Sequence, residues 1–299
     1  MSIPEMTQSI TFLRSTDELS NMSNYINTWE DWHLLPIEKP VFAPPEPKST
    51  LIDVPGGNGV LDLSEALTGY PTYGNRTGSF TFRVIQYTPF SARRPWSDVY
   101  SEIANYLHGQ KRIAILHDDP QWFYEGRFKV ESWTPADTWS EITIGYDVGP
   151  FKWSVQGYGE PWMWDPTDFS LPAIPGNELT ATESTLTVPG KTPAGEAKII
   201  VRNRYEAPVT PIINANFSGG VLTLDAAVVN TTVEWMRPIL SQVNVKSGDN
   251  IFPDLVMTTR RKEYGEWWPV MYNLTFRYAV ANTPVKNAIV TIKFREGRL

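Results

Sequence analysis

The chain has 299 residues, and since a typical domain has about 100–200, the length predicts two domains that each bury a core. A formal net charge of −7 at pH 7 argues against a broad phosphate-binding surface, and so against a nucleic acid partner. There is no cysteine, which excludes a disulfide framework and a structural zinc held by thiolates.

The first residues, from Met1 to Arg14, show no basic segment followed by an apolar one, and nowhere do about 18 apolar residues run together. We therefore expect a protein that is made and folded in the cytosol and that does not insert into a membrane. If it works outside a cell, we expect it to leave by lysis or as part of a particle.

A proline-rich segment spans residues 29–47. It contains Trp29, Trp32 and Phe42 together with five prolines, which fix φ and remove N–H groups that strand pairing needs. The whole chain has 12 Trp and 25 Pro, and this composition favours β structure with rigid connections. We expect this segment to be an extended strap that lies over other structure.

Two turn signals follow the strap. Apolar residues alternate in 51–54 and 60–63, and the Asn58-Gly59 pair between them predicts a β-hairpin. A second turn, at residues 73–78, precedes apolar residues at a spacing of two, which predicts a half-buried strand. These apolar residues are Phe80, Phe82 and Val84.

One α-helix is predicted over residues 97–108, because four apolar residues share a face and Gly109 stands where a C-terminal cap belongs. Three further strands alternate after it, with the turn Asp118-Asp119-Pro120 between the first two. The four helix residues are Val99, Ile103, Tyr106 and Leu107. The strand residues are Ile113 and Ile115, Phe128 and Val130, and Ile142, Ile144 and Tyr146.

The fold class is therefore mainly β, in two domains. For residues 1–152, the alternating strands and the one helix predict a β-sandwich with one packed α-helix. Residues 153–193 lose periodicity and carry six prolines, which predicts a linker or an excursion. Residues 194–299 return to short alternating strands with glycine-containing turns, which predicts a second β-sandwich.

The motifs of catalysis are largely missing. The three histidines, His33, His108 and His117, would all have to converge to form one site. We interpret His108 as a helix C-terminal residue and His117 as part of the turn at Pro120, the alternative for His117 being a metal ligand. The glycines of residues 56–59 lack the Gly-Lys-Ser/Thr ending of a phosphate loop and lead into a strand. We predict no catalytic residue, no metal, no cofactor and no enzyme.

Two tryptophan pairs suggest a saccharide contact, because flat apolar rings with polar edges suit sugars. The pairs are Trp162 with Trp164, and Trp267 with Trp268. The competing interpretation, which we favour, is that these rings pack the proline-rich linker and a face between subunits, where aromatic residues are enriched.

A succession of short motifs runs through the chain in order. These are Thr28-Trp29-Glu30-Asp31-Trp32 with Leu35-Pro36, Asp53-Val54-Pro55-Gly56, the eleven residues 59–69 (Gly-Val-Leu-Asp-Leu-Ser-Glu-Ala-Leu-Thr-Gly), Tyr73-Gly74-Asn75-Arg76, Leu107-His108-Gly109, Asp118-Asp119-Pro120 and Tyr124-Glu125-Gly126-Arg127. Together they resemble the distal tail protein of siphophages over residues 28–152. The last ten residues, 290–299, also resemble the ending of that family.

The resemblance implies a homohexameric ring at the tip of the phage tail tube, built from the N-terminal domains, with a C-terminal galectin-like sandwich of jelly-roll type facing outward. It implies as partners the tail tube protein, the tail-associated fibre or lysin protein, and receptor-binding parts. The protein would be a virion component at the tail tip, made in the host cytoplasm. The N-terminal residues 1–23 and the linker 153–193 depart from the shortest members of the family.

A closed ring needs two different contact surfaces on each protomer. We expect one of them at the strap residues Trp29, Trp32 and Phe42 together with the hairpin around Asn58, since extended proline-rich segments readily lie across a neighbour. The helix is expected to pack on its own sheet.

Three functions compete. The first is the tail-tip hub. The second is a carbohydrate-binding module that contacts host cell-wall saccharide through the C-terminal sandwich, which is compatible with the first. The third is a glycosidase on the same sandwich, for which no residue pattern is visible.

Overall fold

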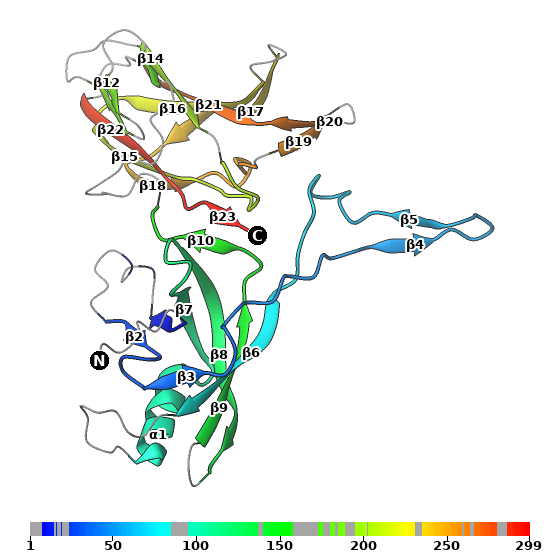
Figure 1. Cartoon of the computed structure of the whole chain (residues 1–299). Helices are drawn as coiled ribbons and strands as arrows, with labels where there is room; N and C mark the ends of the chain where they lie inside the picture. Colours follow the sequence, from blue (N-terminus) through cyan, green and yellow to red (C-terminus); the bar gives the residue numbers. More distant parts are fainter. Residues whose placement is uncertain are drawn as a thin grey trace. The chain divides into compact units, whose positions relative to one another are not determined.

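The computed structural model describes residues 8–299 except for 15, 17–18, 20–23, 85–94, 137–139, 158–172, 176–179, 183–184, 189–194, 202, 231–234, 259, 264–265 and 280–285. It divides into two compact units, Met1–Val155 with Leu299, and Gln156–Arg298. Antiparallel strands dominate both, as the alternation of apolar and polar residues predicts (Figure 1). No helix in the described parts is long and apolar enough to cross a membrane.

The first unit is built on one antiparallel sheet with the strand order β2-β1-β7-β8-β9-β6-β3, and β10 pairs with β8. Its register fixes which residues face the core, since Phe80 lies opposite Ile144 and Phe82 opposite Ile142. The strands are β1 (Ile10–Leu13), β2 (Ile26–Asn27), β3 (Leu34–Pro36), β6 (Arg76–Val84), β7 (Gln110–Leu116), β8 (Trp122–Thr134), β9 (Ser140–Val148) and β10 (Lys152–Ser154).

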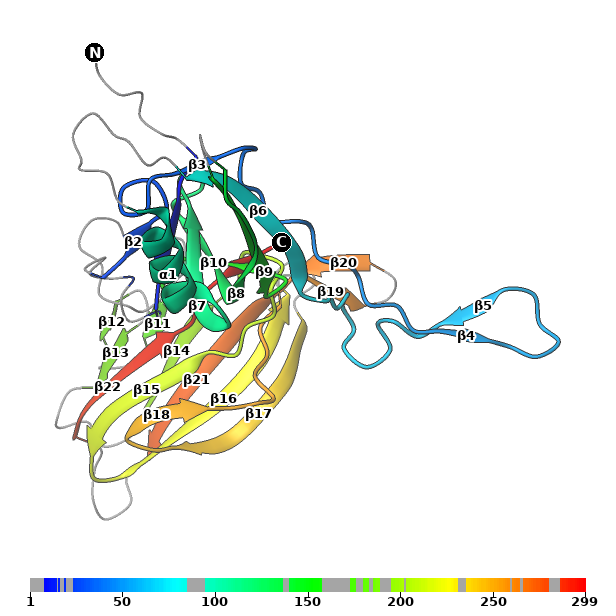
Figure 2. The same cartoon turned by 90° about the horizontal axis from the view of Figure 1, so that it is seen from below.

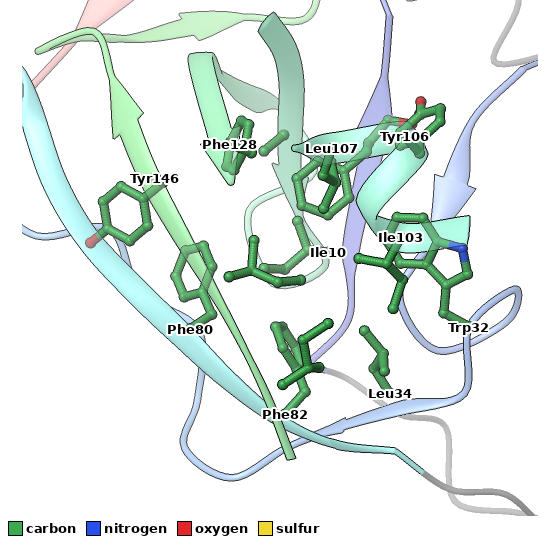
Figure 3. Close-up of a cluster of buried hydrophobic side chains, with 14 of the residues drawn as sticks. Ile10, Trp32, Leu34, Phe80, Phe82, Ile103, Tyr106, Leu107, Phe128 and Tyr146 are labelled. Atoms are coloured by element: carbon green, nitrogen blue, oxygen red, sulfur yellow. The ribbon is translucent and has the colours of Figure 1, made fainter. Parts of the chain in front are cut away.

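Strands from both ends of this sheet close around one core. Ile10 of β1 and Phe82 of β6 are 0% exposed and belong to the same cluster as Ile103 of the helix, although they lie far apart in the strand order (Figure 3). Strand β7 is buried on both faces, because Ala114 faces this cluster while Ile113 faces a smaller one. The predicted inward positions of β6, β7 and β9 are confirmed as core.

The helix α1 (Trp96–Leu107) packs on strands β7 and β8. Its buried side chains are the four predicted from the sequence: Val99, Ile103, Tyr106 and Leu107. Gly109 follows with φ +71, the left-handed conformation that a residue with Cβ disfavours, so this position ends the helix as predicted.

The predicted strap differs from the structure in its first part. Residues 28–32 form a turn in which Asn27 Oδ1 accepts hydrogen bonds from the backbone N–H of Trp29 and Glu30. An asparagine side chain that caps nearby N–H groups favours a turn over an extended chain. Only the part after β3, residues 38–50, lacks a regular helix or strand as the prolines predict.

The second unit contains two five-stranded antiparallel sheets, with the strand orders β11-β14-β21-β16-β17 and β12-β13-β22-β15-β18 (Figure 2). Both sheets bury alternate residues, such as Leu224 of β16 and Ile213 of β15, as the two layers of a sandwich do. The strands are β11 (Ala173–Pro175), β12 (Thr180–Thr182), β13 (Thr185–Val188), β14 (Gly195–Val201), β15 (Ile212–Ser218), β16 (Val221–Asn230), β17 (Trp235–Val245), β18 (Gly248–Ile251), β21 (Met271–Ala279) and β22 (Lys286–Lys293), with a hairpin of β19 (Arg260–Glu263) and β20 (Glu266–Pro269), and β23 (Gly297–Arg298).

The expected linker is in part a piece of this sandwich. Within residues 153–193, β11 pairs with β14, and β13 pairs with β22. Strands β11 and β12 lie at the edges of their sheets, where a proline such as Pro175 removes no needed ladder hydrogen bond. Both strands are three residues long, which is too short for alternation to show, so the sequence pattern did not indicate them.

Candidate assembly interface

Among the described residues of the first unit, the most exposed apolar structure is a two-stranded hairpin. Strands β4 (Leu51–Asp53) and β5 (Val60–Asp62) pair only with each other, and every residue of both is exposed. We call residues 43–75 the arm, which extends away from the sheet of its own unit in both views (Figures 1 and 2). Seven of the fifteen large apolar side chains that are exposed in the described chain lie on it: Leu51, Ile52, Val54, Val60, Leu61, Leu63 and Leu67.

The two faces of the arm differ in character. Ile52 lies directly opposite Leu61, so one face is apolar at this pair. Leu51 lies opposite Asp62, and Asp53 lies opposite Val60, so the other face combines apolar side chains with two carboxylates. The arm is therefore an amphipathic ribbon, and its apolar pair is 46% and 50% exposed at Ile52 and Leu61.

The tip and the base of the ribbon are held by local hydrogen bonds. At the tip, where Asn58 is exposed, Gly56 and Gly59 have positive φ, which glycine adopts without strain. At the base, Asp62 accepts hydrogen bonds from the hydroxyl and the backbone N–H of Ser64, and this donation lowers the pKa of the Asp62 carboxyl. Ser64 Oγ in turn accepts from the N–H of Thr50 at 2.9 Å.

The root of the arm lies in the aromatic part of the core. Phe42, the residue before the arm, is 4% exposed and packs with ring-centroid distances of 4.0 Å to Tyr124 and 4.8 Å to Tyr146. The Tyr146 hydroxyl accepts a hydrogen bond from the N–H of Ala43 at 2.9 Å. The chain thus leaves the core at a point where both its side chain and its backbone are held.

Arg76, at the start of β6, holds the returning chain. It is 5% exposed, its Nη1 donates to the carbonyl of Ala43 at 2.9 Å and its Nε to the carbonyl of Pro150 at 2.8 Å. Its guanidinium also lies over the ring of Tyr124, 5.5 Å from the centroid. Burial lowers the pKa of Arg76 and raises the pKa of Tyr124.

Two of the four predicted interface residues belong to the core of their own unit. Trp32 is 1% exposed and donates from Nε1 to Glu102 Oε1 of α1 at 3.1 Å, and Phe42 fills the aromatic cluster. A side chain that is almost fully covered has no surface left for a neighbour, so we assign both to the core. Trp29 is half-buried and Asn58 lies exposed at the arm tip, and their interface role stays a prediction.

The other candidate residues are the two tryptophan pairs and the histidines. Trp162 and Trp164 lie outside the described residues, while Trp267 and Trp268 lie in β20, opposite Lys262 and Arg261, with side chains outside the described set. Two of the histidine rings bind backbone groups: His33 the carbonyl of Trp29, and His108 the N–H of Val130 in β8. The described residues contain no group of three or more His, Asp or Glu placed to hold a metal ion.

Sequence reasoning missed Arg76 as a residue of the arm root. The Tyr73-Gly74-Asn75-Arg76 run indicates a turn before a strand, and the structure has that turn and that strand. The guanidinium binds backbone carbonyls that are 33 and 74 residues away from Arg76 in the sequence. Because any residue has a carbonyl, these partners leave no mark in the sequence. The first residue of β6 is also two residues before Gly78, but neither position marks Arg76 as buried, so the sequence carries no signal for its role.

Comparison with known proteins finds similarity among solved structures. No protein-family model matches the chain, and no curated protein does. Among solved structures it is similar to the Dit (gp 19.1) protein of phage SPP1, described as a paradigm of the hub adsorption apparatus in phages that infect Gram-positive bacteria. The two are 12% identical, with 88% of this chain and 93% of that chain covered and a TM-score of 0.41. A likeness of this size does not identify the chain.

Proposed function

We propose that the chain is a structural protein of a phage tail tip, which joins other virion proteins through its contact surfaces and carries out no catalytic step. The ordered motifs between Thr28 and Lys152 support this proposal, because they resemble the siphophage distal tail family as a set. The partners in this proposal are further copies of the chain, the tail tube protein, and a tail-associated fibre or lysin protein.

The observation that carries the proposal is the exposed arm. Full burial of a Val, Leu or Ile side chain stabilises by roughly 1.5–3 kcal/mol relative to exposure. Ile52 and Leu61 place such side chains on a projecting ribbon that no other described strand pairs with. Contiguous apolar surface of this kind is typical of a protein–protein contact. The arm is therefore the proposed assembly element of the chain.

The proposed partner of the arm is a second copy of the chain. A closed ring requires a heterologous contact, in which one surface of a protomer meets a different surface of the next. A projecting arm meets this requirement because it differs from any surface on the body of its neighbour. We propose that six copies close in this way into a homohexameric ring.

The edges of the sheet in the first unit argue for the arm as the contact, because they offer little to a neighbouring strand. In β3, the N–H of Leu34 is bonded to the carbonyl of Thr28, and Pro36 has no N–H. In β2, the N–H of Asn27 donates to Asp31 Oδ2 at 2.7 Å. Short edges whose donors are used or removed resist edge-to-edge pairing.

The experiment that tests the proposal replaces the apolar pair of the arm, as Ile52→Ser with Leu61→Ser. Light scattering on the unmodified protein should give six times the protomer mass of 33.9 kDa, and the double variant should give the protomer mass. The matched control makes the same change at two exposed apolar residues of the second unit, Val221→Ser with Ile251→Ser, and should keep the high mass. A monomeric unmodified protein, or a double variant with undiminished mass, would contradict the proposal.

A further inference from the structure

The arm joins the body of the first unit at its root, where Asn75 Nδ2 of the arm also donates to Asp147 Oδ1 of β9 at 2.8 Å. Ala43 marks where the chain leaves the core, and Arg76 marks where it returns. The guanidinium of Arg76 binds the carbonyl of Ala43 through Nη1 and that of Pro150 through Nε. One side chain therefore joins three stretches of chain: the outgoing arm, the first residue of β6 and the loop after β9.

The chemistry of this contact is more specific than core packing requires. Arg76 is 5% exposed, and its guanidinium donates to two carbonyls and lies over the ring of Tyr124. Covering a charge in this way has an energetic cost that an apolar side chain of similar size would avoid. The rigid fork of a guanidinium can hold two separate carbonyls at fixed angles, which neither an apolar side chain nor a lysine can do.

Tyr146 completes the contact from the other side of Ala43. Its hydroxyl accepts the N–H of Ala43 while Arg76 binds the carbonyl of the same residue, so both backbone groups of Ala43 are held. Gly78 leaves the space that the Tyr146 hydroxyl occupies, because a Cβ on Gly78 would clash with that oxygen.

We propose that Arg76 and Tyr146 form a clamp that fixes the direction in which the arm leaves the body, and that Arg76 is a positioning residue for assembly. The clamp acts through the arm and does not touch the partner. A small rotation at the root displaces the far end of the ribbon, and a ring closes only if the rotation from one protomer to the next is fixed. The inference rests on the proposed function, in which the arm binds a second copy of the chain.

The test measures the direction of the arm apart from assembly. The chain has no cysteine, so spin labels can be placed at Glu65→Cys on the arm and Ser132→Cys on β8, both exposed. Dilution of labelled chains with unlabelled ones removes distances between labels on different chains. The distance between the two labels of one chain remains, and we expect its distribution to be narrow. The variants Arg76→Lys, Arg76→Met and Gly78→Ala should each lose the narrow distribution.

The matched control is Arg83→Lys, a change of the same kind on the same strand. Arg83 has a side chain that is 42% exposed and pairs with Glu141, so this variant should keep the narrow distribution. If Arg76→Met does not fold, Arg76→Lys and Tyr146→Phe decide the matter, because the latter removes only the hydroxyl that accepts from Ala43. Unchanged distributions in all folded clamp variants would overturn the proposal.

Assembly is measured on the same variants by light scattering. Clamp variants in which the distance between the labels is broadly distributed should also lose the uniform mass of the ring. A variant that keeps this mass although its distance distribution is broad would overturn the positioning role of Arg76. Failure of the proposed function is recognised separately, since Ile52→Ser with Leu61→Ser would then leave the mass unchanged whatever the clamp variants do.

Discussion

At the scale of single residues, Trp32 shows how the first unit is held together. Its ring meets Tyr106 edge to face at a centroid distance of 5.8 Å, and its indole N–H donates to Glu102, so the turn at residues 28–32 is attached to α1 twice. The same ring lies 6.2 Å from Phe12 of β1. Trp32 therefore links the turn, the helix and the sheet.

We predict that Trp32→Ala lowers the free energy of unfolding by about 3–5 kcal/mol, because the substitution leaves a cavity in a closed core. Urea denaturation followed by circular dichroism measures the change. The control Trp29→Ala removes a half-buried ring and should cost clearly less. Dissociation of the assembly by Trp32→Ala without any loss of stability would contradict the core assignment and restore the interface role.

At the scale of elements, the end of α1 depends on the conformation of one residue. Gly109 has φ +71, and no atom lies within 4 Å of the place that a Cβ would occupy. Its N–H donates to the carbonyl of Phe128 in β8 at 2.8 Å. The glycine therefore ends the helix and starts the return of the chain toward the sheet.

Gly109→Ala should lower the free energy of unfolding by about 1–2 kcal/mol through backbone strain alone, since a left-handed residue with Cβ costs that much and the site has room. Thermal unfolding in a calorimeter measures it. Gly149→Ala is the matched control, because this glycine has no positive φ and its nearest contact to a Cβ is an ordinary 3.8 Å. Equal losses in both variants would show that strain at Gly109 is not the cause.

Local periodicity explains which elements the sequence could predict. The alternation in β6 and β9 and the helical spacing in α1 gave the correct inward residues, because each pattern is complete within one element. The edge strands β11 and β12 were missed, since each is three residues long, too short to show alternation, and β11 also contains Pro175.

The candidate site was predictable only in part. The hairpin at Asn58 follows from its turn residues, but alternation shows only that two faces differ and not whether another element covers either of them. The sequence therefore indicated the ribbon and could not show its exposure. Burial of Trp32 and Phe42 likewise depends on residues far along the chain, Glu102 and Tyr124, which composition and spacing do not connect.

At the scale of the whole molecule, the proposed contact is mainly apolar, and this makes its response to salt predictable. Exposed charges are screened within about 3 Å at 1 M salt, whereas apolar burial is not weakened by it. We predict that the mass of the assembly measured by light scattering stays the same between 0.1 M and 1 M sodium chloride. Dissociation to protomers at 1 M would mean that Asp53 and Asp62, and not Ile52 and Leu61, carry the contact.

In the described part of the first unit one arm projects and the sheet edges are already blunted, so each protomer would make two contacts: it donates its own ribbon and receives that of a neighbour. Protomers with two contact surfaces can associate only end to end. Incomplete rings would therefore be open arcs, and each arc would keep one unpaired surface at either end until the ring closes. Growth of this kind rises steeply with concentration. If the angle per contact drifts, the same protomers run on into open filaments.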